Sequence, residues 1–111
     1  MTSGYEEVYA RWQSDPEGFW AEAAEAIHWY KKWDTVLDSS QKPFYRWFVG
    51  GETNTCYNCV DRHVDSGRGD QPALIYDSPI TGAKRTLTYS DLKDEVSRFA
   101  GVLRQHGIEK G

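Results

Sequence analysis

The final third of the chain restricts the fold more than any other stretch. Ala73–Tyr76 and Arg85–Tyr89 are short apolar or β-branched runs that predict two strands, with a turn around Thr81-Gly82 between them. An amphipathic helix is expected to follow, from Ser90 to His106. A strand, a turn, a second strand and a helix in this order predict a small α+β unit in residues 73–111.

The helix predicted there has start and stop signals. Ser90 is the expected N-cap, because its hydroxyl can accept a hydrogen bond from an amide left free at the helix start. Gly107 is expected to be left-handed, with Ile108 packing back on Leu103. The apolar residues that share one face at helical spacing are Leu92, Val96, Phe99, Ala100 and Leu103.

Two further helices are expected near the N-terminus. In residues 5–12 aromatic and apolar residues recur at i, i+3, i+4 and i+7, which predicts an amphipathic helix. Asp15 is the expected N-cap of a second helix, with Pro16 at its first position. This helix is expected to continue through Phe19–Ile27, weakened at Gly18 by about 1 kcal/mol relative to alanine.

The middle of the chain is less regular. From His28 to Gly51 aromatic residues are separated by polar ones, and Phe44–Val49 is interpreted as a short strand or extended arm. This stretch is typical of a strap that lies across another surface. A helix is expected over Cys56–Asp65, capped by Asn54 or Thr55, and residues 66–72 are expected to form the loop that ends it.

Length, charge and composition exclude several classes of protein. A chain of 111 residues has room for one domain. The net charge is −4 without a basic run, so we expect no nucleic-acid partner. No stretch reaches the ~20 apolar residues of a membrane span, and the N-terminus lacks the pattern of a signal peptide. With two cysteines and no export signal, a cytoplasmic location is predicted.

The sharpest candidate site is Cys56-x-x-Cys59 followed by His63. These residues could converge on a metal, but structural zinc needs four ligands, and His28 and His106 have no spacing that links them to the group. A thioredoxin-like pair would need a βαβ context that the sequence does not indicate. The two cysteines are therefore expected to be buried small apolar residues.

Two other short motifs have weaker functional interpretations. Arg68-Gly69-Asp70 matches an adhesion tripeptide, which is interpreted as chance in a chain without an export signal. Asp61 and Arg62 could contact a neighbouring domain, although a surface ion pair worth ~0–1 kcal/mol is favoured. Residue chemistry alone nominates no catalytic, cofactor-binding or metal-binding residue.

A set of stretches, taken together and in order, points to one family. They are Tyr5-Glu6-Glu7-Val8-Tyr9, Asp15-Pro16-Glu17-Gly18-Phe19-Trp20, Trp29, Trp33, Phe44-Tyr45-Arg46-Trp47-Phe48, Gly50-Gly51-x-Thr53-Asn54-x-Cys56-x-Asn58-x-x-Asp61-Arg62, Leu87-Thr88-Tyr89-Ser90-Asp91-Leu92 and Ala100-x-x-Leu103-x-x-x-Gly107-Ile108-x-Lys110-Gly111. They cover nearly the whole chain. On these residues the chain resembles the N-terminal region of the AMP-forming acetyl- and propionyl-CoA synthetases, which are adenylate-forming enzymes.

The resemblance implies a two-step ligase in the parent protein. A short carboxylate attacks ATP with Mg²⁺ to give an acyl-adenylate and pyrophosphate, and CoA then displaces AMP. It also implies a large α/β N-terminal part, with residues 1–72 as a wrap region and residues 73–111 as the start of the AMP-binding domain. The family's phosphate loop, its Tyr-Gly-x-Thr-Glu block, its ribose-binding Asp and its C-terminal catalytic Lys have no counterpart in the 111 residues.

We therefore expect a fragment that ends at Gly111, has a structural role and is inactive alone. Its partners would be the remainder of the synthetase and, through it, a small carboxylate; exposed aromatic residues could add self-association. Phe44–Phe48 and Thr53–Asn58 favour propionate, while Cys59–His63 fits acetate equally well, so both stay open. The alternatives are a stand-alone interaction module that docks through residues 29–48 and a small Cys/His metal protein.

Overall fold

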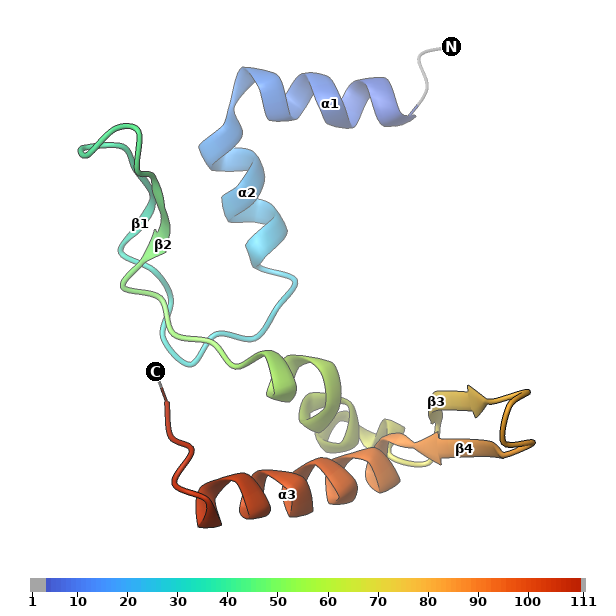
Figure 1. Ribbon diagram of the computed structural model, residues 1–111. Helices are drawn as coiled ribbons and strands as arrows, with labels where there is room; N and C mark the ends of the chain where they lie inside the picture. Colours follow the sequence, from blue (N-terminus) through green and yellow to red (C-terminus); the bar gives the residue numbers. More distant parts are fainter. Residues whose placement is uncertain (1–3, 111) are drawn as a thin grey trace. The chain divides into compact units, whose positions relative to one another are not determined.

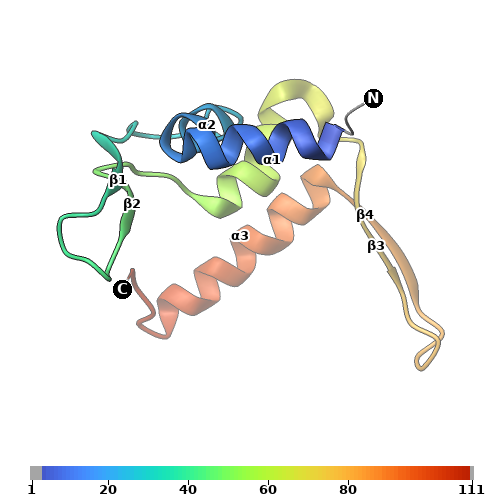
Figure 2. The same cartoon turned by 90° about the horizontal axis from the view of Figure 1, so that it is seen from above.

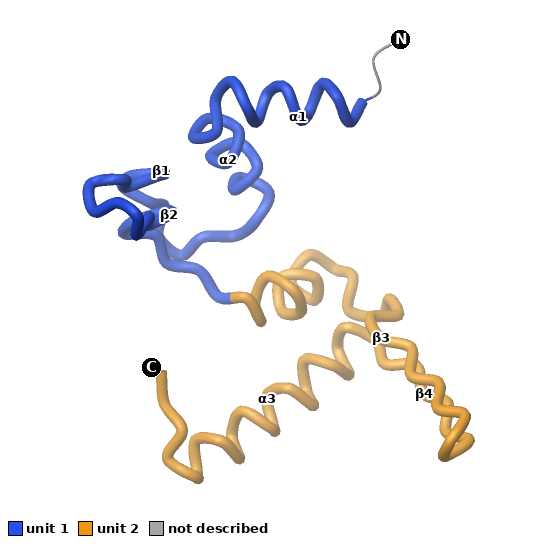
Figure 3. The backbone as a smooth tube through the Cα atoms, turned by 45° about the horizontal axis from the view of Figure 1, so that its top comes forward, with its two compact units in different colours: residues 1–54 blue, residues 55–111 orange. Residues whose placement is uncertain are grey.

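The computed structural model describes residues 4–110 and has both helices and short antiparallel strands (Figure 1), which confirms the α+β class. The chain divides into two compact units, residues 1–54 and residues 55–111 (Figure 3).

Unit 1 begins with two helices, as the sequence predicts. Helix α1 covers Gly4–Ser14 and helix α2 covers Pro16–Ala24. Asp15 caps α2, because its carboxylate accepts a hydrogen bond of 3.0 Å from the amide of Gly18. A Cβ atom added at Gly18 would collide with that carboxylate, so the glycine that weakens the helix also leaves room for its cap.

Helix α2 ends at Ala24, so the prediction that it reaches Ile27 is wrong. After Ala24 the backbone tightens, and the amides of Glu25, Ala26 and Ile27 bond to carbonyls three residues back. The carbonyl of Ala24 also accepts a hydrogen bond of 2.9 Å from the indole of Trp29. Competition for these last carbonyls, which no apolar periodicity reveals, stops the helix early.

The aromatic stretch that follows is an antiparallel hairpin. Strand β1, Thr35–Asp38, pairs with strand β2, Arg46–Val49, and an isolated bridge joins Lys31 to Glu52. Between that bridge and the Thr35–Val49 pair the first strand carries one residue more than the second. Phe48 lies near this irregularity with a left-handed φ of 51°.

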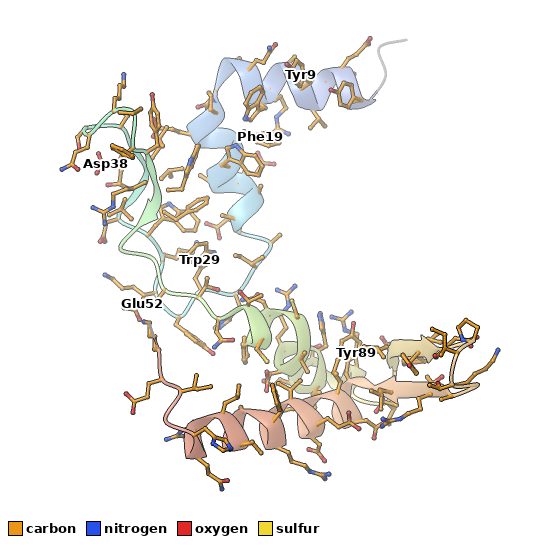
Figure 4. The ribbon with its side chains drawn as sticks, viewed as in Figure 1. Tyr9, Phe19, Trp29, Asp38, Glu52 and Tyr89 are labelled. Carbon is orange, nitrogen blue, oxygen red and sulfur yellow. The ribbon has the colours of Figure 1, made fainter. Side chains whose placement is uncertain are left out.

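The hairpin corrects the interpretation of residues 28–51 as an irregular strap. Trp29, Trp33 and Phe48 form an aromatic trio with ring centroids 5.0–5.4 Å apart. All three are half-buried, and Figure 4 shows Trp29 beside the hairpin. The expectation holds in part at the far end of the hairpin, where Phe44 is 78% exposed.

Unit 2 opens with a helical run in which two π-helical stretches stand out, η1 (Tyr57–Asp61) and η2 (Val64–Arg68). The helix predicted over residues 56–65 is therefore present, but it is underwound and extends to Arg68 rather than ending in a loop at residue 66. Gly67 breaks the regular backbone with a φ of 83°.

A hairpin and a long helix complete unit 2. Strand β3, Pro72–Asp77, pairs with strand β4, Lys84–Thr88, and helix α3 covers Tyr89–Gln105. The prediction of these three elements is confirmed. In Figures 1 and 2 the hairpin extends away from the first turn of α3.

The N-cap of α3 differs from the predicted one, whereas its C-terminal stop is the predicted one. Thr88, not Ser90, is the N-cap: its hydroxyl accepts from the amide of Asp91 at 3.1 Å, while the Asp91 carboxylate accepts from the amide of Thr88 at 3.0 Å. At the other end Gly107 has a φ of 77°, and the amide of Ile108 bonds to the carbonyl of Leu103, so the predicted C-terminal stop is confirmed.

Neither unit has a core of normal size. Among residues 4–110 only Ala24, which is 8% exposed, and Val60, which is 7% exposed, are buried. The chain exposes 8915 Å², whereas two separate folded domains of half its mass would expose about 7,500 Å² by the usual scaling of surface with mass. The excess is large for so short a chain, and it consists in part of aromatic and aliphatic side chains.

Candidate functional site

The Cys56-x-x-Cys59 motif does not form the buried pair that the sequence predicts. Both thiols are exposed, so that prediction is wrong. The buried residue of η1 is Val60, and η1 packs against α3, so the helical run directs the apolar valine inward and leaves the cysteines outside. Among the described residues no three His, Cys, Asp or Glu side chains are grouped as a metal site would require.

The chemistry of Cys56 and His63 is explained by their neighbours. Although the Cys56 side chain is exposed, nearby protein atoms partly desolvate its sulfur, and the carboxylate oxygen of Asp61 lies 3.7 Å from it; both effects raise the pKa of this thiol. Partial burial, followed by the charges of Arg68 and Arg62, lowers the pKa of His63. The thiol is therefore a poor nucleophile at neutral pH, and the imidazole is neutral there.

His63 contributes to the structure of unit 2. Its Nδ1 contacts the guanidinium of Arg68, which can only donate, so Nδ1 accepts and the ring proton lies on Nε2. Its ring centroid lies 4.7 Å from that of Tyr89, at the start of α3. This histidine links the helical run to α3.

The Arg68-Gly69-Asp70 motif also has a local structural explanation. The carbonyl of Gly69 accepts a hydrogen bond of 3.0 Å from the amide of Ser90. A Cβ atom at Gly69 would lie 2.6 Å from the Ser90 hydroxyl oxygen, so glycine permits this close approach. Gly69 therefore holds the loop against α3, while Arg68 contacts His63 within the helical run.

Asp61 joins a small ionic group rather than a catalytic one. Lys93 of α3 lies 3.6 Å from the Asp61 carboxylate and 3.5 Å from that of Asp65. Partial burial lowers the pKa of Lys93, but the carboxylates of Asp65 and Asp61 raise it more, so it lies above the usual value. The predicted pair of Asp61 with Arg62 stays a prediction.

One candidate surface is apolar and lies in unit 1. Helices α1 and α2 line an open groove whose walls are aromatic or aliphatic: Tyr5, Val8, Tyr9, Trp12, Phe19 and Trp20. Figure 4 labels Tyr9 and Phe19 on the two helices. Trp20 also lines a second apolar groove, in which α2 faces Trp29 and Phe48. Within residues 4–110 no charged side chain lines either groove, so both are suited to contact with apolar protein surface.

Unit 2 has uncovered apolar surface as well. On α3 the expected face is present, but no described residue of this helix is fully buried, and Phe99 is 63% exposed. One face of the β3–β4 hairpin forms an open apolar groove lined by Leu74, Tyr76, Leu87 and the side chain of Arg85. The periodicity of the sequence predicts the α3 face, but not the hairpin face, because the apolar run of β3 does not alternate with polar residues.

Comparison with known proteins identifies a family that this chain matches. A family model described as acetyl-coenzyme A synthetase N-terminus matches residues 5–59. The human protein named acyl-CoA synthetase short-chain family member 3, mitochondrial, is 51% identical over 109 residues, which are 98% of this chain and 16% of that protein. The chain belongs to the short-chain acyl-CoA synthetase family and corresponds to its N-terminal region.

Bacterial members of the family are almost as similar. The acetyl-coenzyme A synthetase of Rubrobacter xylanophilus is 50% identical over 104 residues, or 94% of this chain and 16% of that protein. That of Mycobacterium bovis is 47% identical over 105 residues, or 95% of this chain and again 16% of the relative. The chain therefore spans about a sixth of the length of the relatives that it matches.

Among the described residues, no helix has the length and apolar character needed to cross a bilayer.

Proposed function

We propose that this chain is the N-terminal region of a ligase that makes acyl-CoA from a short carboxylate, ATP and CoA, with AMP and pyrophosphate as products. The observation that carries the proposal is 51% identity over 98% of the chain to a short-chain acyl-CoA synthetase. The role proposed for the region is structural: its apolar grooves pack against the remainder of the synthetase.

The proposed division of labour leaves the chemistry to the parent protein. ATP, Mg²⁺ and CoA would act in the parent, and no residue of this chain is assigned a catalytic, cofactor-binding or metal-binding role. The neutral His63 and the protonated Cys56 thiol support this assignment, because both side chains have local structural partners. We propose that the chain alone has no ligase activity.

We further propose how the chain is divided within the adenylate-forming fold. Residues 1–72 would form the wrap region, and residues 73–111 the start of the large α/β AMP-binding domain. The uncovered apolar face of α3 supports this, since helices of α/β layers cover sheets. The boundary between the two compact units lies between residues 54 and 55 of the sequence, so it differs from the domain boundary that we propose.

We propose propionate as the carboxylate, because the sequences of Phe44–Phe48 and Thr53–Asn58 resemble those of propionate-activating members of the family. A cytoplasmic location also stays a proposal, and the human relative is named as mitochondrial. The ratio of turnover with propionate to turnover with acetate, measured on a parent protein that contains this chain, tests the first of these. A higher kcat/KM for acetate would contradict it.

The alternative function is a stand-alone interaction module that docks through residues 29–48. Its support is the exposed end of the β1–β2 hairpin, where Phe44 and Tyr45 are more than half exposed. The aromatic trio weakens it, because Trp29, Trp33 and Phe48 already contact one another. A defined partner that binds the isolated monomeric chain, and is lost with Phe44→Ser, would favour this alternative.

A two-fragment assay tests the main proposal. The chain is produced alone and together with an acetyl-coenzyme A synthetase of Rubrobacter xylanophilus that lacks its matching 16%. We expect no AMP release by the chain, none or little by the truncated enzyme, and recovery when the two are combined. AMP release by the chain alone would overturn the structural role.

A further inference from the structure

The two strands of the β3–β4 hairpin differ in a way that indicates which edge is covered in the complete protein. A hairpin of two strands is marginal by itself and needs a third strand or a packing partner. Among the described residues its sheet contains only β3 and β4, so each strand has one edge without a partner strand.

Strand β4 has the features of a protected edge. It begins with Lys84 and Arg85, and charged side chains are a common means of preventing further pairing. The guanidinium of Arg85 is held 2.7 Å from the Glu95 carboxylate of α3. At the other end of the strand, the outward amide of Thr88 already donates to the carboxylate of Asp91. The free edge of β4 is therefore charged and partly occupied.

Strand β3 has the opposite character. Its central residues, Ala73-Leu74-Ile75-Tyr76, are a continuous apolar run, which is typical of a strand covered on both faces rather than of an edge strand. Yet Ile75 is 75% exposed. The only charged residue of β3, Asp77, lies at the end of the strand. An uncharged, exposed apolar edge of this kind invites strand pairing.

The register of the hairpin shows which backbone groups point outward. The amide of Ser78 bonds to the carbonyl of Ala83 beyond one end of the ladder, and the amide of Tyr89 bonds to the carbonyl of Gln71 beyond the other. Hydrogen-bonded and non-hydrogen-bonded pairs alternate in antiparallel ladders. Counting from either end, the Ile75–Thr86 pair is a non-hydrogen-bonded one. The amide of Ile75 therefore points to the free edge of β3, and that of Thr86 to the free edge of β4.

We propose that the free edge of β3 receives a further strand, supplied by the part of the synthetase that lies outside this chain, and that β4 stays the edge of the sheet. The incoming segment would be an extended apolar strand that bonds to the outward groups of Ile75 and Asp77. This inference rests on the proposed function, because the chain spans 16% of its relatives and the strand would come from the remainder.

Hydrogen exchange tests the proposal without a substitution. The chain replaces the matching 16% of the Rubrobacter xylanophilus enzyme, and exchange of single amides is measured in the fusion protein and in the isolated chain. In the fusion protein the amides of Ile75 and Asp77 should exchange at least about tenfold more slowly than those of Lys84 and Thr86, because a buried backbone hydrogen bond protects its amide. In the isolated chain the four should be similar.

A matched pair of proline variants gives a second test. Ile75→Pro and Thr86→Pro lie directly opposite each other and impose the same φ, but each removes the amide of a different edge. Ile75→Thr keeps the amide and reproduces the side chain of Thr86. Ile75→Pro should unfold the fusion protein on the order of tenfold faster than either Thr86→Pro or Ile75→Thr, by the loss of one buried hydrogen bond.

The outcomes separate this inference from the proposed function. If the fusion protein releases AMP but Ile75 and Asp77 are unprotected, or if Thr86→Pro is the more harmful variant, the strand assignment is wrong and the function stands. If β3 is protected but the fusion protein releases no AMP, the strand assignment stands and the function fails. Protection of Ile75 in a dimer of the isolated chain would overturn the proposal in favour of a second copy.

Discussion

The two units reach local order by different means. In unit 1 the order depends on large rings: the aromatic trio holds the hairpin, and the Trp29 indole ends α2 by bonding to the Ala24 carbonyl. In unit 2 it depends on backbone and polar contacts: the capping box at Thr88, the close approach of Gly69 to Ser90, and Lys93 between two carboxylates. A chain that buries few side chains can still form defined helices and hairpins, provided that close local contacts such as these hold each of them in place.

The largest effect is expected from the aromatic trio. Trp29→Ala removes contacts with Trp33 and Phe48 and also the hydrogen bond to α2. Complete truncation of a core tryptophan costs about 3–5 kcal/mol, and the half-burial of Trp29 reduces the expected loss to about 2–3 kcal/mol. Urea unfolding of the whole chain, followed by near-ultraviolet circular dichroism, measures it.

The control for that loss is an aromatic residue outside the trio. Phe44 is 78% exposed, so Phe44→Ala should change the free energy of unfolding by no more than about 0.5 kcal/mol. If the two variants were equally destabilised, ring packing would not be what orders unit 1, and the contrast between the units would fail.

Unit 2 should be sensitive at a site where no large side chain is lost. In Gly69→Ala the new methyl group would lie 2.6 Å from the Ser90 hydroxyl oxygen, so either that hydroxyl must rotate or the loop must move away from α3. The expected cost is about 1–2 kcal/mol, as for other overpacked sites. Thermal unfolding measures it, and adding Ser90→Ala should recover most of the loss, because it removes the oxygen. A double variant no more stable than Gly69→Ala would contradict this contact.

The caps of α3 provide a smaller effect. Thr88→Ala removes the hydroxyl that accepts from the amide of Asp91, and the loss of such a cap typically costs about 1 kcal/mol. Ser90→Ala should be nearly neutral, although the sequence suggests Ser90 as the cap. Thermal unfolding of the two variants in parallel decides between these residues. A greater loss for Ser90→Ala would restore the prediction made from the sequence.

The parts of the fold that the sequence predicts well are those with local causes. The helix starting after Asp15, the β3–β4 hairpin and the stop at Gly107 follow from caps, turns and periodicity, and the structure confirms them. Thr88 and Ser90 are both good cap residues, two positions apart, and only the reciprocal bond with Asp91 distinguishes them. A sequence pattern cannot rank two such candidates.

The parts that the sequence did not predict have causes that leave no regular pattern in the sequence. The end of α2 depends on an indole five residues beyond it, and the pairing of β1 with β2 on aromatic contacts that leave no alternating pattern. The exposure of Cys56 and Cys59 depends on the underwound turn of η1, which directs Val60 inward instead. In the candidate surface, α1 and the α3 face were predictable from periodicity, whereas the hairpin face was not.

The smallest effect separates the cap of α3 from its surroundings by pH. Hydrogen bonds from the amide and hydroxyl of Thr88, with the charge of Arg85 adding to them, lower the pKa of Asp91 below its usual 3.8. A group whose folded-state pKa is depressed stabilises the fold above its unfolded-state pKa, and loses that contribution as the pH falls through the folded-state value. The helicity of α3 should therefore be constant above about pH 5 and decline below about pH 4.

Asp91→Asn isolates this contribution, because the amide keeps the size of the carboxylate but does not titrate. The variant should be less stable than the unaltered chain above pH 5, and the difference should shrink below pH 4 and vanish once the pH is well below the depressed pKa of Asp91, where its carboxyl is protonated. Circular dichroism at several pH values follows both proteins. A difference that persists unchanged at pH 2 would mean that Asp91 acts through shape alone. In that case the charge of Asp91 would not contribute to the stability of the cap at the start of α3, although polar contacts order the rest of unit 2.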